Sequence, residues 1–423
     1  MKILVLNSGS SSQKSSLYEL SDPLPTHPAT PFWGGKIEWD SEQAELQIST
    51  AQGARCTLRP PSMSRREATS QLLAQLWSGP CAVIGGPSEI DVVGHRVVNG
   101  GTEYVGPSFI TPELIAAVQR MSAFAPLHNR IELESIEIIS QQFGSVPQVA
   151  VFDTAFHSRL PEAANVYPGP YDWIAKGIRR YGFHGINHQY CAERSAQLLN
   201  KDLLSLKLVT CHLGNGCSLA AIRGGHSVDT TMGFTPLEGL MMGTRSGSVD
   251  PGILTYLMRQ GAATAEQLDN LLNTQSGLLG ISGISGDMRK IVAAMKQGNA
   301  RAKLAFEIFT HRLRSCIGSM VAILNGCDAL VFTAGIGENS AEVRAAACDN
   351  LGFLGAQLDP QKNGRPSPDQ DIAQEDSAVR ILVIRAQEDW AIAQACWRLA
   401  SHESPQVVSQ KPAGLRPATT PAT

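Results

Sequence analysis

The sequence contains three short segments that could bind phosphate groups. Residues 7–14 begin at Asn7, continue through a glycine and four serines, and end at Lys14, so hydroxyl groups, flexible backbone and a cation fall in one turn. Residues 212–216 and 335–339 are also rich in glycine. Glycine lets backbone N–H groups approach an anion because no Cβ stands in the way. Taken alone, each segment also fits an ordinary turn, and 212–216 fits an Asn-Gly hairpin.

Two arginines lie in glycine-rich surroundings and could bind a carboxylate or a phosphate. Arg96 lies in the stretch 94–101, and Arg245 lies in the stretch 241–247. The guanidinium group is planar and forms paired hydrogen bonds with both kinds of anion. A single arginine at a strand or loop end is more often a solvated charge, so neither residue defines a site by itself.

Two histidines and two acidic residues could take part in the same chemistry. His184 and His128 stand in short glycine- or proline-containing motifs, although each type of residue is more often structural than catalytic. Asp153 directly follows an apolar run, and Glu388 lies soon after another. Acidic residues at strand ends commonly bind magnesium or act as bases. Together with the turns and arginines, they form a set suited to magnesium-assisted phosphoryl transfer.

The elements that must position these residues alternate between strands and helices. Apolar runs with β-branched residues precede the glycine turns and indicate buried strands, at 3–6, 92–98, 208–213 and 329–333. Capping residues and apolar spacing predict helices between them, from 112 to about 124, from the Thr264–Gln267 capping box onward, and over 302–324. This alternation predicts an α/β protein with its sites at strand ends.

The pattern of strand, glycine turn and second apolar stretch occurs twice, beginning at Ile3 and again at Leu208. The repeat suggests a duplicated unit, with a first half that covers residues 1 to about 155. Residues 22–62 are rich in proline and polar residues and are predicted to be an irregular insert. Residues 401–423 show no packing pattern and are predicted to be a disordered tail.

Composition excludes several classes of protein. The 423 residues carry a net charge of -3, with 35 basic and 38 acidic side chains, which disfavours a protein that coats nucleic acid. No apolar run reaches the length of a membrane span, and the N-terminus does not resemble a signal peptide. Nine scattered cysteines without a Cys-x-x-Cys motif predict neither a disulfide framework nor a zinc ribbon, and favour the cytoplasm.

Several common catalytic motifs are absent as well. Gln13 stands where a P-loop has its second glycine, so that motif is disfavoured. Neither His-Glu-x-x-His nor Gly-x-Ser-x-Gly occurs, which weakens a zinc protease or an α/β-hydrolase.

Several motifs together resemble the acetokinase family over nearly the whole chain, up to about residue 399. The resemblance depends on segments 7–14, 94–98, 151–157, 180–185, 212–216, 229–247, 276–289 and 332–339. It implies an α/β fold of two duplicated ribonuclease H-like domains around a nucleotide cleft, as in actin, sugar kinases and heat-shock chaperone ATPases. It implies domains at 1–155 and 156–387, with a C-terminal helix near 388–400 completing the first.

The resemblance also implies an activity and its partners. The expected reaction is reversible phosphoryl transfer between ATP and acetate, which gives acetyl phosphate and ADP. The implied cofactor is Mg²⁺, with Mn²⁺ as the alternative ion, and ATP or ADP is the co-substrate. A homodimer is implied, with neither nucleic acid nor a membrane as a partner.

The resemblance further implies roles at the reacting end of the site. Asp153 matches the catalytic aspartate, and His184 and Arg245 match the residues that stabilise the transition state. Arg96 matches the acetate-binding arginine. The apolar pocket beside it matches Val98, Leu127, Phe183 and Pro236.

Other matching positions imply the metal and nucleotide sites. Asn7 and Glu388 match magnesium-site residues, and Lys14 matches a contact to the nucleotide phosphates. The nucleotide-binding segments match His212, Leu213, Gly214, Asn215 and Gly216, then Asp287, Met288 and Arg289, and finally Gly335, Ile336, Gly337, Glu338 and Asn339.

Simple chemistry limits what these groups must do. A short carboxylic acid has a pKa of roughly 3.9, so at pH 7 it is already a carboxylate and needs no general base. The difficulty is the approach of one anion to another. Cationic groups at Arg96, Arg245 and His184, with Mg²⁺, are therefore expected to dominate, and Asp153 is expected to orient a cation or the metal instead of removing a proton.

The chain departs from the family pattern at several positions near these groups. Asn99 stands where the family usually has histidine, Arg130 replaces a proline, and Ser248 replaces an aspartate. Residues 186–187 are Ile-Asn in place of Thr-Ser, and 386–389 are Ala-Gln-Glu-Asp in place of Thr-Asn-Glu-Glu. None of these changes removes an arginine, histidine or aspartate with an implied role.

Three alternatives remain open from the sequence. A propionate or butyrate kinase of the same family is the closest, because one methylene is worth only about 1–3 kcal/mol of discrimination. A nucleotide-binding ATPase without acyl-phosphate chemistry is a second, although hydrolysis alone needs no pair of arginines. A catalytically inactive relative is the third, motivated by Asn99 and Ser248.

Overall fold

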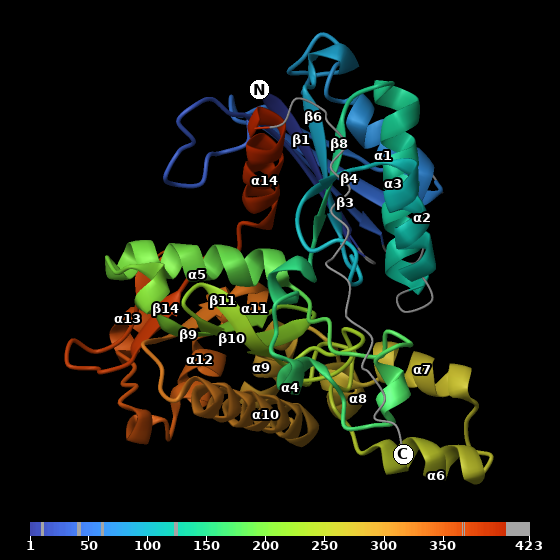
Figure 1. The fold of residues 1–423 in the computed structure, drawn as a ribbon. Helices are drawn as coiled ribbons and strands as arrows, with labels where there is room; N and C mark the ends of the chain where they lie inside the picture. Colours follow the sequence, from blue (N-terminus) through green and yellow to red (C-terminus); the bar gives the residue numbers. More distant parts are fainter. Residues whose placement is uncertain are drawn as a thin grey trace, which may run out of the picture.

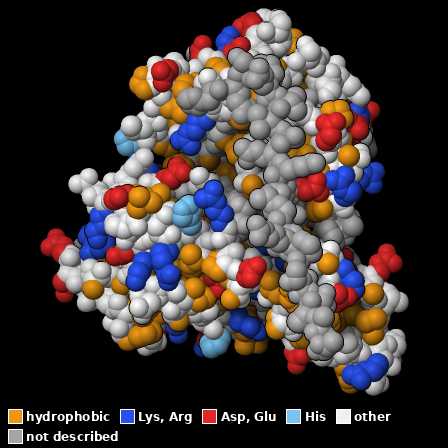
Figure 2. Space-filling model, in the orientation of Figure 1, with side chains coloured by type: hydrophobic (Ala, Val, Ile, Leu, Met, Phe, Trp, Pro, Cys, Tyr) orange, Lys and Arg blue, Asp and Glu red, His pale blue; other side chains and the backbone are white. Residues whose placement is uncertain are grey.

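The computed structural model of the protein describes residues 1–9, 12–39, 44–60, 63–121, 126–365, 367 and 369–402, with side chains except those of 126–129 and 402. Two α/β halves lie one above the other, and the last helix, α14, returns to the first half (Figure 1). Basic and acidic side chains are interspersed over the face shown in Figure 2, in keeping with the balanced charge of the sequence.

The first half is built on an eight-stranded sheet in the order β5-β4-β3-β2-β1-β6-β8-β7. Strand β1 runs parallel to β6, and β6 runs parallel to β8, while β1 and β2 form an antiparallel hairpin. The strands are β1 (Lys2–Ser8), β2 (Ser12–Glu19), β3 (Trp33–Trp39), β4 (Ala44–Thr50), β5 (Arg55–Leu58), β6 (Val92–Val97), β7 (Ser108–Phe109) and β8 (Gln148–Phe152).

The second half is built on a six-stranded sheet in the order β11-β10-β9-β12-β14-β13. Its strands are β9 (Lys207–Leu213), β10 (Cys217–Arg223), β11 (His226–Thr230), β12 (Ala329–Thr333), β13 (Gln370–Asp371) and β14 (Arg380–Val383). The order and direction of these strands repeat those of β3-β2-β1-β6-β8-β7. The fold is therefore the duplicated α/β arrangement that the sequence predicts.

The prediction of an irregular insert over 22–62 was wrong, because this region contributes β3, β4 and β5 to the first sheet. Alternate side chains of β4 are buried, as expected for a strand with one face on a core. Gly35 of β3 lies against Leu72 of helix α1, and a Cβ there would come within 3.0 Å of that side chain. Proline and polar residues flank these strands and hide their alternation in the sequence.

Helices cover both sheets. In the first half they are α1 (Arg65–Ala74), α2 (Pro112–Met121) and α3 (Pro126–Phe143). The later helices are α4 (Glu162–Asn165), α5 (Gly185–Leu199), α6 (Pro251–Arg259), α7 (Ala265–Thr274), α8 (Gly277–Ser282), α9 (Met288–Lys296), α10 (Ala300–Leu324), α11 (Ala334–Asn339), α12 (Ala341–Cys348), α13 (Pro360–Gly364) and α14 (Glu388–His402).

Helix ends agree with the capping residues in the sequence. The Thr264–Gln267 capping box begins α7, and α10 ends at Asn325, which adopts the left-handed conformation. Helix α2 begins at Pro112 as predicted and ends at Met121. None of the helices in the described part of the chain combines the length and apolar character needed to cross a membrane.

Helix α14 packs on β1 and β6 of the first sheet and on α5 of the second half. Gly94 of β6 permits this contact, because a Cβ there would lie 2.8 Å from Ile392 of α14. The boundaries at 155 and 387 stay a prediction. Residues 401 and 402 are the last of α14, and the rest of the segment predicted to be a disordered tail lies outside the described residues.

Candidate active site

Arg96 and Asp153 form a buried ion pair at the ends of two neighbouring strands. Parallel pairing of β6 with β8 sets Arg96 opposite Val151, so the side chain of Asp153 follows at the same edge of the sheet. An Nη2 hydrogen of Arg96 is donated to Oδ2 of Asp153, whose side chain is 1% exposed. The two residues that the sequence marks as substrate-binding and catalytic therefore touch each other.

The buried pair is electrostatically strained and only partly satisfied. Burial raises the pKa of Asp153 and the Glu388 carboxylate raises it further, while the Arg96 guanidinium opposes both. The Nε atom of Arg96 and the Oδ1 atom of Asp153 are buried without a hydrogen-bond partner among the described residues. Arg96 therefore keeps a buried donor available for a ligand.

Asp153 is also fixed through its backbone to the second half of the molecule. Its carbonyl oxygen accepts a hydrogen bond from Gly185 N–H at 2.9 Å, at the start of α5. A Cβ at position 185 would collide with that carbonyl oxygen. The glycine after His184 is thus required by close packing between α5 and the end of β8.

His184 precedes α5 and adopts the left-handed conformation with φ of 55°. Its ring stacks on His212 with centroids 3.9 Å apart and an angle of 10°. Its Nδ1 atom lies 2.8 Å from the hydroxyl oxygen of Ser218. Its Nε2 atom and the Nη1 atom of Arg245 lie 3.4 and 3.6 Å from where a Cβ would stand on Gly216. Because Gly216 has no Cβ, it leaves a space beside which the His184 ring and the Arg245 guanidinium group meet.

Burial, together with the neighbouring histidines and arginines, keeps the His184 ring neutral. Burial lowers the pKa of His184 well below its usual value, and His212, Arg96 and Arg245 lower it further. Arg245 donates from Nη1 to the carbonyl oxygen of Pro236 at 3.0 Å. Burial and the charge of Arg96 lower the pKa of Arg245. The two arginines lie within electrostatic reach of each other and of His184.

Glu132 is a buried neighbour of this group that the sequence does not reveal. Its Oε1 accepts a hydrogen bond from Val98 N–H at 3.0 Å, and its side chain is almost fully buried. Burial raises the pKa of Glu132 to about 8, although the Arg96 charge opposes the shift. Helix α3 carries further glutamates at 134 and 137, so nothing in the sequence distinguishes the one that faces Arg96.

The apolar residues expected to hold the substrate methyl group are partly assembled. Val98 and Phe183 are buried in one cluster with Leu213 and Met242. Pro236 contacts Arg245 through its carbonyl oxygen. Leu127 and His128 lie in α3, but their side chains are not among those that the structure describes.

Asn7 joins two carboxylates at the start of α14. Its Nδ2 donates to Glu388 Oε2 and to Asp389 Oδ1, each at 3.0 Å. Ser16 donates to the other oxygen of Asp389 at 2.8 Å. Burial raises the pKa of Glu388, but Arg96, His212 and the Asn7 amide outweigh burial, so the net shift is downward. Asp389 is a second missed residue, although it directly follows Glu388.

This corner has the chemistry that a magnesium site requires. Magnesium prefers carboxylate oxygens and keeps several waters or phosphate oxygens, so one or two protein carboxylates suffice. Glu388 and Asp389 supply these oxygens, and Glu388 is held ionised by its neighbours. Within the described ranges, no group of three His, Cys, Asp or Glu side chains forms a closed metal cage. The residues present therefore fit an open magnesium site and not a structural one.

The nucleotide-binding segments expected from the sequence meet at the edge of the second sheet. The 212–216 turn joins β9 to β10, and Gly243 N–H donates to the carbonyl oxygen of Asn215 at 3.1 Å. A Cβ on Gly243 would lie 3.0 Å from the carbonyl oxygen of Gly286, just before Asp287 caps α9. Residues 335–339 form α11, which packs on β9.

The remaining expected residues lie nearby with different degrees of exposure. Arg289 pairs with Asp287 at 2.6 Å, and its side chain is 89% exposed. Glu338 of α11 accepts a hydrogen bond from Ala386 N–H at 2.9 Å. Lys14 is exposed on β2, opposite Asn7 in the hairpin, and its charge reaches both Glu338 and Glu388.

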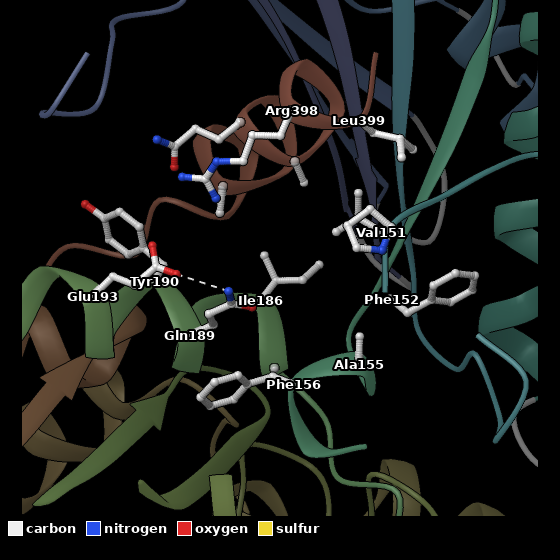
Figure 3. Close-up of a pocket in the computed structure, with 15 residues that line it drawn as sticks. Val151, Phe152, Ala155, Phe156, Ile186, Gln189, Tyr190, Glu193, Arg398 and Leu399 are labelled. Carbon is white, nitrogen blue, oxygen red and sulfur yellow. Dashed lines mark hydrogen bonds between the residues drawn. The ribbon is translucent and has the colours of Figure 1, made fainter. Parts of the chain in front are cut away.

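A separate cavity of about 430 Å³ lies where α5, α14 and β8 come together (Figure 3). Apolar side chains such as Phe152 and Ile186 line it, with Gln189, Glu193 and Arg398 among its polar neighbours. It borders the candidate site through Val151 and Gly185, close in sequence to Asp153 and His184. None of the arginines or histidines of the site lines it, so this cavity is distinct from the place where chemistry is expected.

Comparisons with known proteins agree on one family. Residues 2–394 match the acetokinase family. The chain is 59% identical to acetate kinase of Cyanothece sp. over 406 residues, which cover 96% of this chain and 100% of that protein. It is 60% identical to acetate kinase of Gloeobacter violaceus over 403 residues, which cover 94% and 99%.

Solved structures agree with the sequence matches. The crystal structure of Porphyromonas gingivalis acetate kinase is similar with a TM-score of 0.86 and 38% identity, covering 94% of this chain and 99% of that one. A propionate kinase from Francisella tularensis is similar with a TM-score of 0.85 and 37% identity, covering 93% and 98%.

Proposed function

The chain belongs to the acetokinase family and acts as an acetate kinase, and from this premise we propose how its residues carry out the reaction. The acetate carboxylate attacks the γ-phosphoryl group of ATP directly and in line, giving acetyl phosphate and ADP. The observation that carries this proposal is the convergence of His184 Nε2 and Arg245 Nη1 beside Gly216, within electrostatic reach of Arg96.

Charge neutralisation is the main contribution of the protein. Acetate is ionised at pH 7, so no proton has to be removed before attack. Two anions must instead be brought together, and buried cations reduce that repulsion more than solvated ones do. Arg245 and His184 donate to the transferring phosphoryl group, where negative charge is spread over the equatorial oxygens.

Arg96 binds the acetate carboxylate. Its unpartnered Nε atom supports this role, because a buried donor without a partner is costly until a ligand supplies one. Val98, Phe183 and Pro236 enclose the methyl group, and the place of Leu127 in the same pocket stays a prediction from the sequence. Asp153 holds Arg96 in place through their ion pair and does not act as a base.

Asn7, Glu388 and Asp389 would hold the magnesium ion, with Mn²⁺ as an alternative. The bound metal would neutralise charge on the phosphate oxygens of ATP. Lys14 contacts the phosphates from the β1–β2 hairpin. Nucleotide contacts come from the segments 212–216, 287–289 and 335–339.

The chain forms a homodimer, and α6 belongs to the interface. This helix buries none of its own side chains in the described part of the chain. Ile253, Tyr256 and Met258 are about half exposed on it. Exposed apolar side chains gathered on one helix commonly mark a protein interface. The cytoplasmic location that the sequence favours stays a prediction.

One assay tests the function. Purified protein is incubated with MgATP and acetate, propionate or butyrate, and acyl phosphate is trapped as hydroxamate. We expect hydroxamate with acetate as the preferred substrate. Higher kcat/KM with propionate or butyrate would assign the chain to a neighbouring kinase specificity. ATP hydrolysis without hydroxamate would favour a nucleotide-binding ATPase, and no turnover would favour an inactive relative.

A further inference from the structure

A line of buried hydrogen bonds leads from the core of the second half to His184. The hydroxyl oxygen of Thr210, on β9, lies 2.7 Å from Nδ1 of His188. Nε2 of His188 lies 2.8 Å from the hydroxyl oxygen of Ser218 on β10. The same oxygen lies 2.8 Å from Nδ1 of His184. Thr210, His188 and Ser218 are each 0% exposed.

The fold explains why these four side chains meet. His184 and His188 are four residues apart and face the sheet from the start of α5. Thr210 pairs with Ala220 and His212 pairs with Ser218, so Thr210 and Ser218 lie on adjacent strands two positions apart. Side chains two positions apart on a strand point to the same face. The hydroxyl groups are therefore presented to the histidines of α5.

Hydrogen counting gives this line a direction. A neutral imidazole has one N–H donor and one acceptor nitrogen, and a hydroxyl group has one hydrogen to donate. Burial lowers the pKa of both His184 and His188 well below the usual value, so both rings are neutral. The single hydrogen of Ser218 can be donated to one histidine only. Among the described residues the two histidines are the hydrogen-bond partners of the Ser218 hydroxyl group, so its hydrogen goes to one of them and fixes which nitrogen carries the hydrogen in both rings.

Both directions satisfy the three short contacts, but only one of them also uses the Thr210 hydrogen in a short contact. When Thr210 donates to His188 Nδ1, His188 Nε2–H donates to Ser218, and Ser218 donates to His184 Nδ1. In the opposite direction the Thr210 hydrogen is left with the carbonyl oxygen of Ala220 at 3.5 Å, the outer limit of a hydrogen bond. The opposite direction would also turn a bare lone pair of His184 Nε2 toward the phosphoryl group.

We propose that Thr210, His188 and Ser218 are positioning residues that hold His184 in the tautomer with its hydrogen on Nε2. In this tautomer the neutral ring donates a hydrogen bond to the transferring phosphoryl group without needing a positive charge. The proposal rests on the proposed role of His184 in acetate kinase chemistry. It adds that the role depends on groups which do not touch any substrate.

The adjacent ring is held in the same way by a different residue. The Nδ2 amide hydrogen of Asn187 is donated to Nδ1 of His212 at 2.8 Å, so the hydrogen of neutral His212 also lies on Nε2. Burial lowers the pKa of His212 to about 4. The two stacked rings therefore both present a donor on the nitrogen opposite their buried contacts.

Kinetics of two variants test the proposal. Ser218→Ala removes the hydroxyl between the rings, and Thr210→Val removes the donor to His188 without changing side-chain shape greatly. We expect kcat to fall about 10–100-fold in Ser218→Ala, the range seen when groups that orient a functional histidine are removed, and less in Thr210→Val. The KM values for acetate and MgATP should stay close to those of the parent. Ser218→Thr, which keeps a hydroxyl, should recover most of kcat.

Ser227→Ala is the matched control. Ser227 is as buried as Ser218 and also contacts a histidine, because its hydroxyl oxygen lies 2.8 Å from Nδ1 of His157. His157 contacts the carbonyl oxygen of Phe183 through Nε2, and its ring packs edge-on against His188, but among the described residues it forms no hydrogen bond with Thr210, His188, Ser218 or His184. Ser227→Ala therefore removes a buried serine–histidine hydrogen bond outside the line, and we expect its kcat to stay near the parent value. An equal fall in Ser227→Ala would overturn the proposal.

Nitrogen NMR of the full chain, with ¹⁵N-labelled histidine, reads the tautomer directly and does not depend on turnover. The His184 signal is assigned by its loss in His184→Gln. We expect the parent hydrogen on Nε2, with a shift toward Nδ1 in Ser218→Ala and Thr210→Val. A parent hydrogen on Nδ1, or an unchanged tautomer in both variants, would refute the proposal even in an active enzyme.

The two experiments separate this inference from the proposed function. If the parent protein forms no acetyl hydroxamate, the proposed function fails while the spectra still decide the tautomer. Circular dichroism checks folding. If Ser218→Ala does not fold, the spectrum of Thr210→Val decides.

Discussion

Replacing Glu132 by glutamine should remove the share of the pH dependence of stability and acetate binding that comes from this carboxyl group. Burial raises the pKa of Glu132 from 4.5 to about 8, with Arg96 and Val98 N–H acting against the shift and Asp153 adding to it. Glutamine has nearly the same shape and keeps an oxygen for Val98 N–H. The variant therefore removes the ionisation and preserves the packing.

The sign of the effect follows from the direction of the shift. Because the native pKa lies above the unfolded value, the parent protein has the full contribution of neutral Glu132 below about pH 4.5. It loses that contribution as the pH rises to about 8. The interval between these two pKa values corresponds to at most about 5 kcal/mol of unfolding free energy, at about 1.4 kcal/mol per pH unit. Glu132→Gln should match the parent near pH 5 and unfold at a higher temperature than the parent at pH 9.

The same ionisation should weaken acetate binding. Ionised Glu132 is a second negative charge near Arg96, so the acetate KM of the parent should rise above pH 8, while that of Glu132→Gln should stay flat. Thermal unfolding and acetate KM are measured from pH 5 to 9. Glu137→Gln on the same helix is the control, because Glu137 is exposed and pairs with Arg66. Parallel pH profiles for the parent and Glu132→Gln would refute the reasoning.

Four other variants test separate parts of the site. Arg245→Ala should lower kcat about 10²–10³-fold, the cost of one lost transition-state donor, and a change in KM alone would contradict that role. Asp153→Asn should lower kcat and raise the acetate KM, since Arg96 loses its ion-pair partner. Near-full activity with an unchanged magnesium requirement would exclude a positioning role. Glu388→Gln should raise the magnesium concentration that gives half-maximal activity at saturating ATP, and an unchanged requirement would remove Glu388 from the metal site. Tyr256→Glu should lower the mass measured by light scattering from dimer to monomer, and a stable dimer would place the interface elsewhere.

Local signals predicted the elements that depend on neighbouring residues. The capping box at Thr264 and the left-handed Asn325 after α10 fix helix ends through hydrogen bonds to residues a few positions away. The turn of the 212–216 segment was likewise predictable, because Gly214, Asn215 and Gly216 are residues that favour a tight hairpin turn. Strands β3 to β5 were not predicted, although each pairs with the strand before it in the sequence, because proline and polar residues around them hide their alternation.

The site residues that the sequence does not reveal all depend on contacts with residues far away in the sequence. Glu132 meets Val98 across 34 residues, and Asp389 meets Ser16 across 373. Ser218 is an ordinary strand serine until α5 brings two histidines to its hydroxyl. Residue types indicated phosphoryl transfer, but only the packing of α5 and α14 against the sheets selects which polar residues serve it.

The buried charges explain how the molecule can keep two arginines together before any substrate arrives. Arg96 lowers the pKa of Arg245, which is the signature of mutual repulsion. Asp153 pairs with Arg96, and Glu388 lies within reach of the same guanidinium, so the folded protein offsets this repulsion with its own carboxylates. These carboxylates come from β8 and α14, which both pack in the first half, whereas Arg245 and His184 come from the second. Binding of acetate and ATP therefore brings added negative charge to arginines whose repulsion is already partly offset, and the attraction is strongest when both anions are bound between the groups of the two halves.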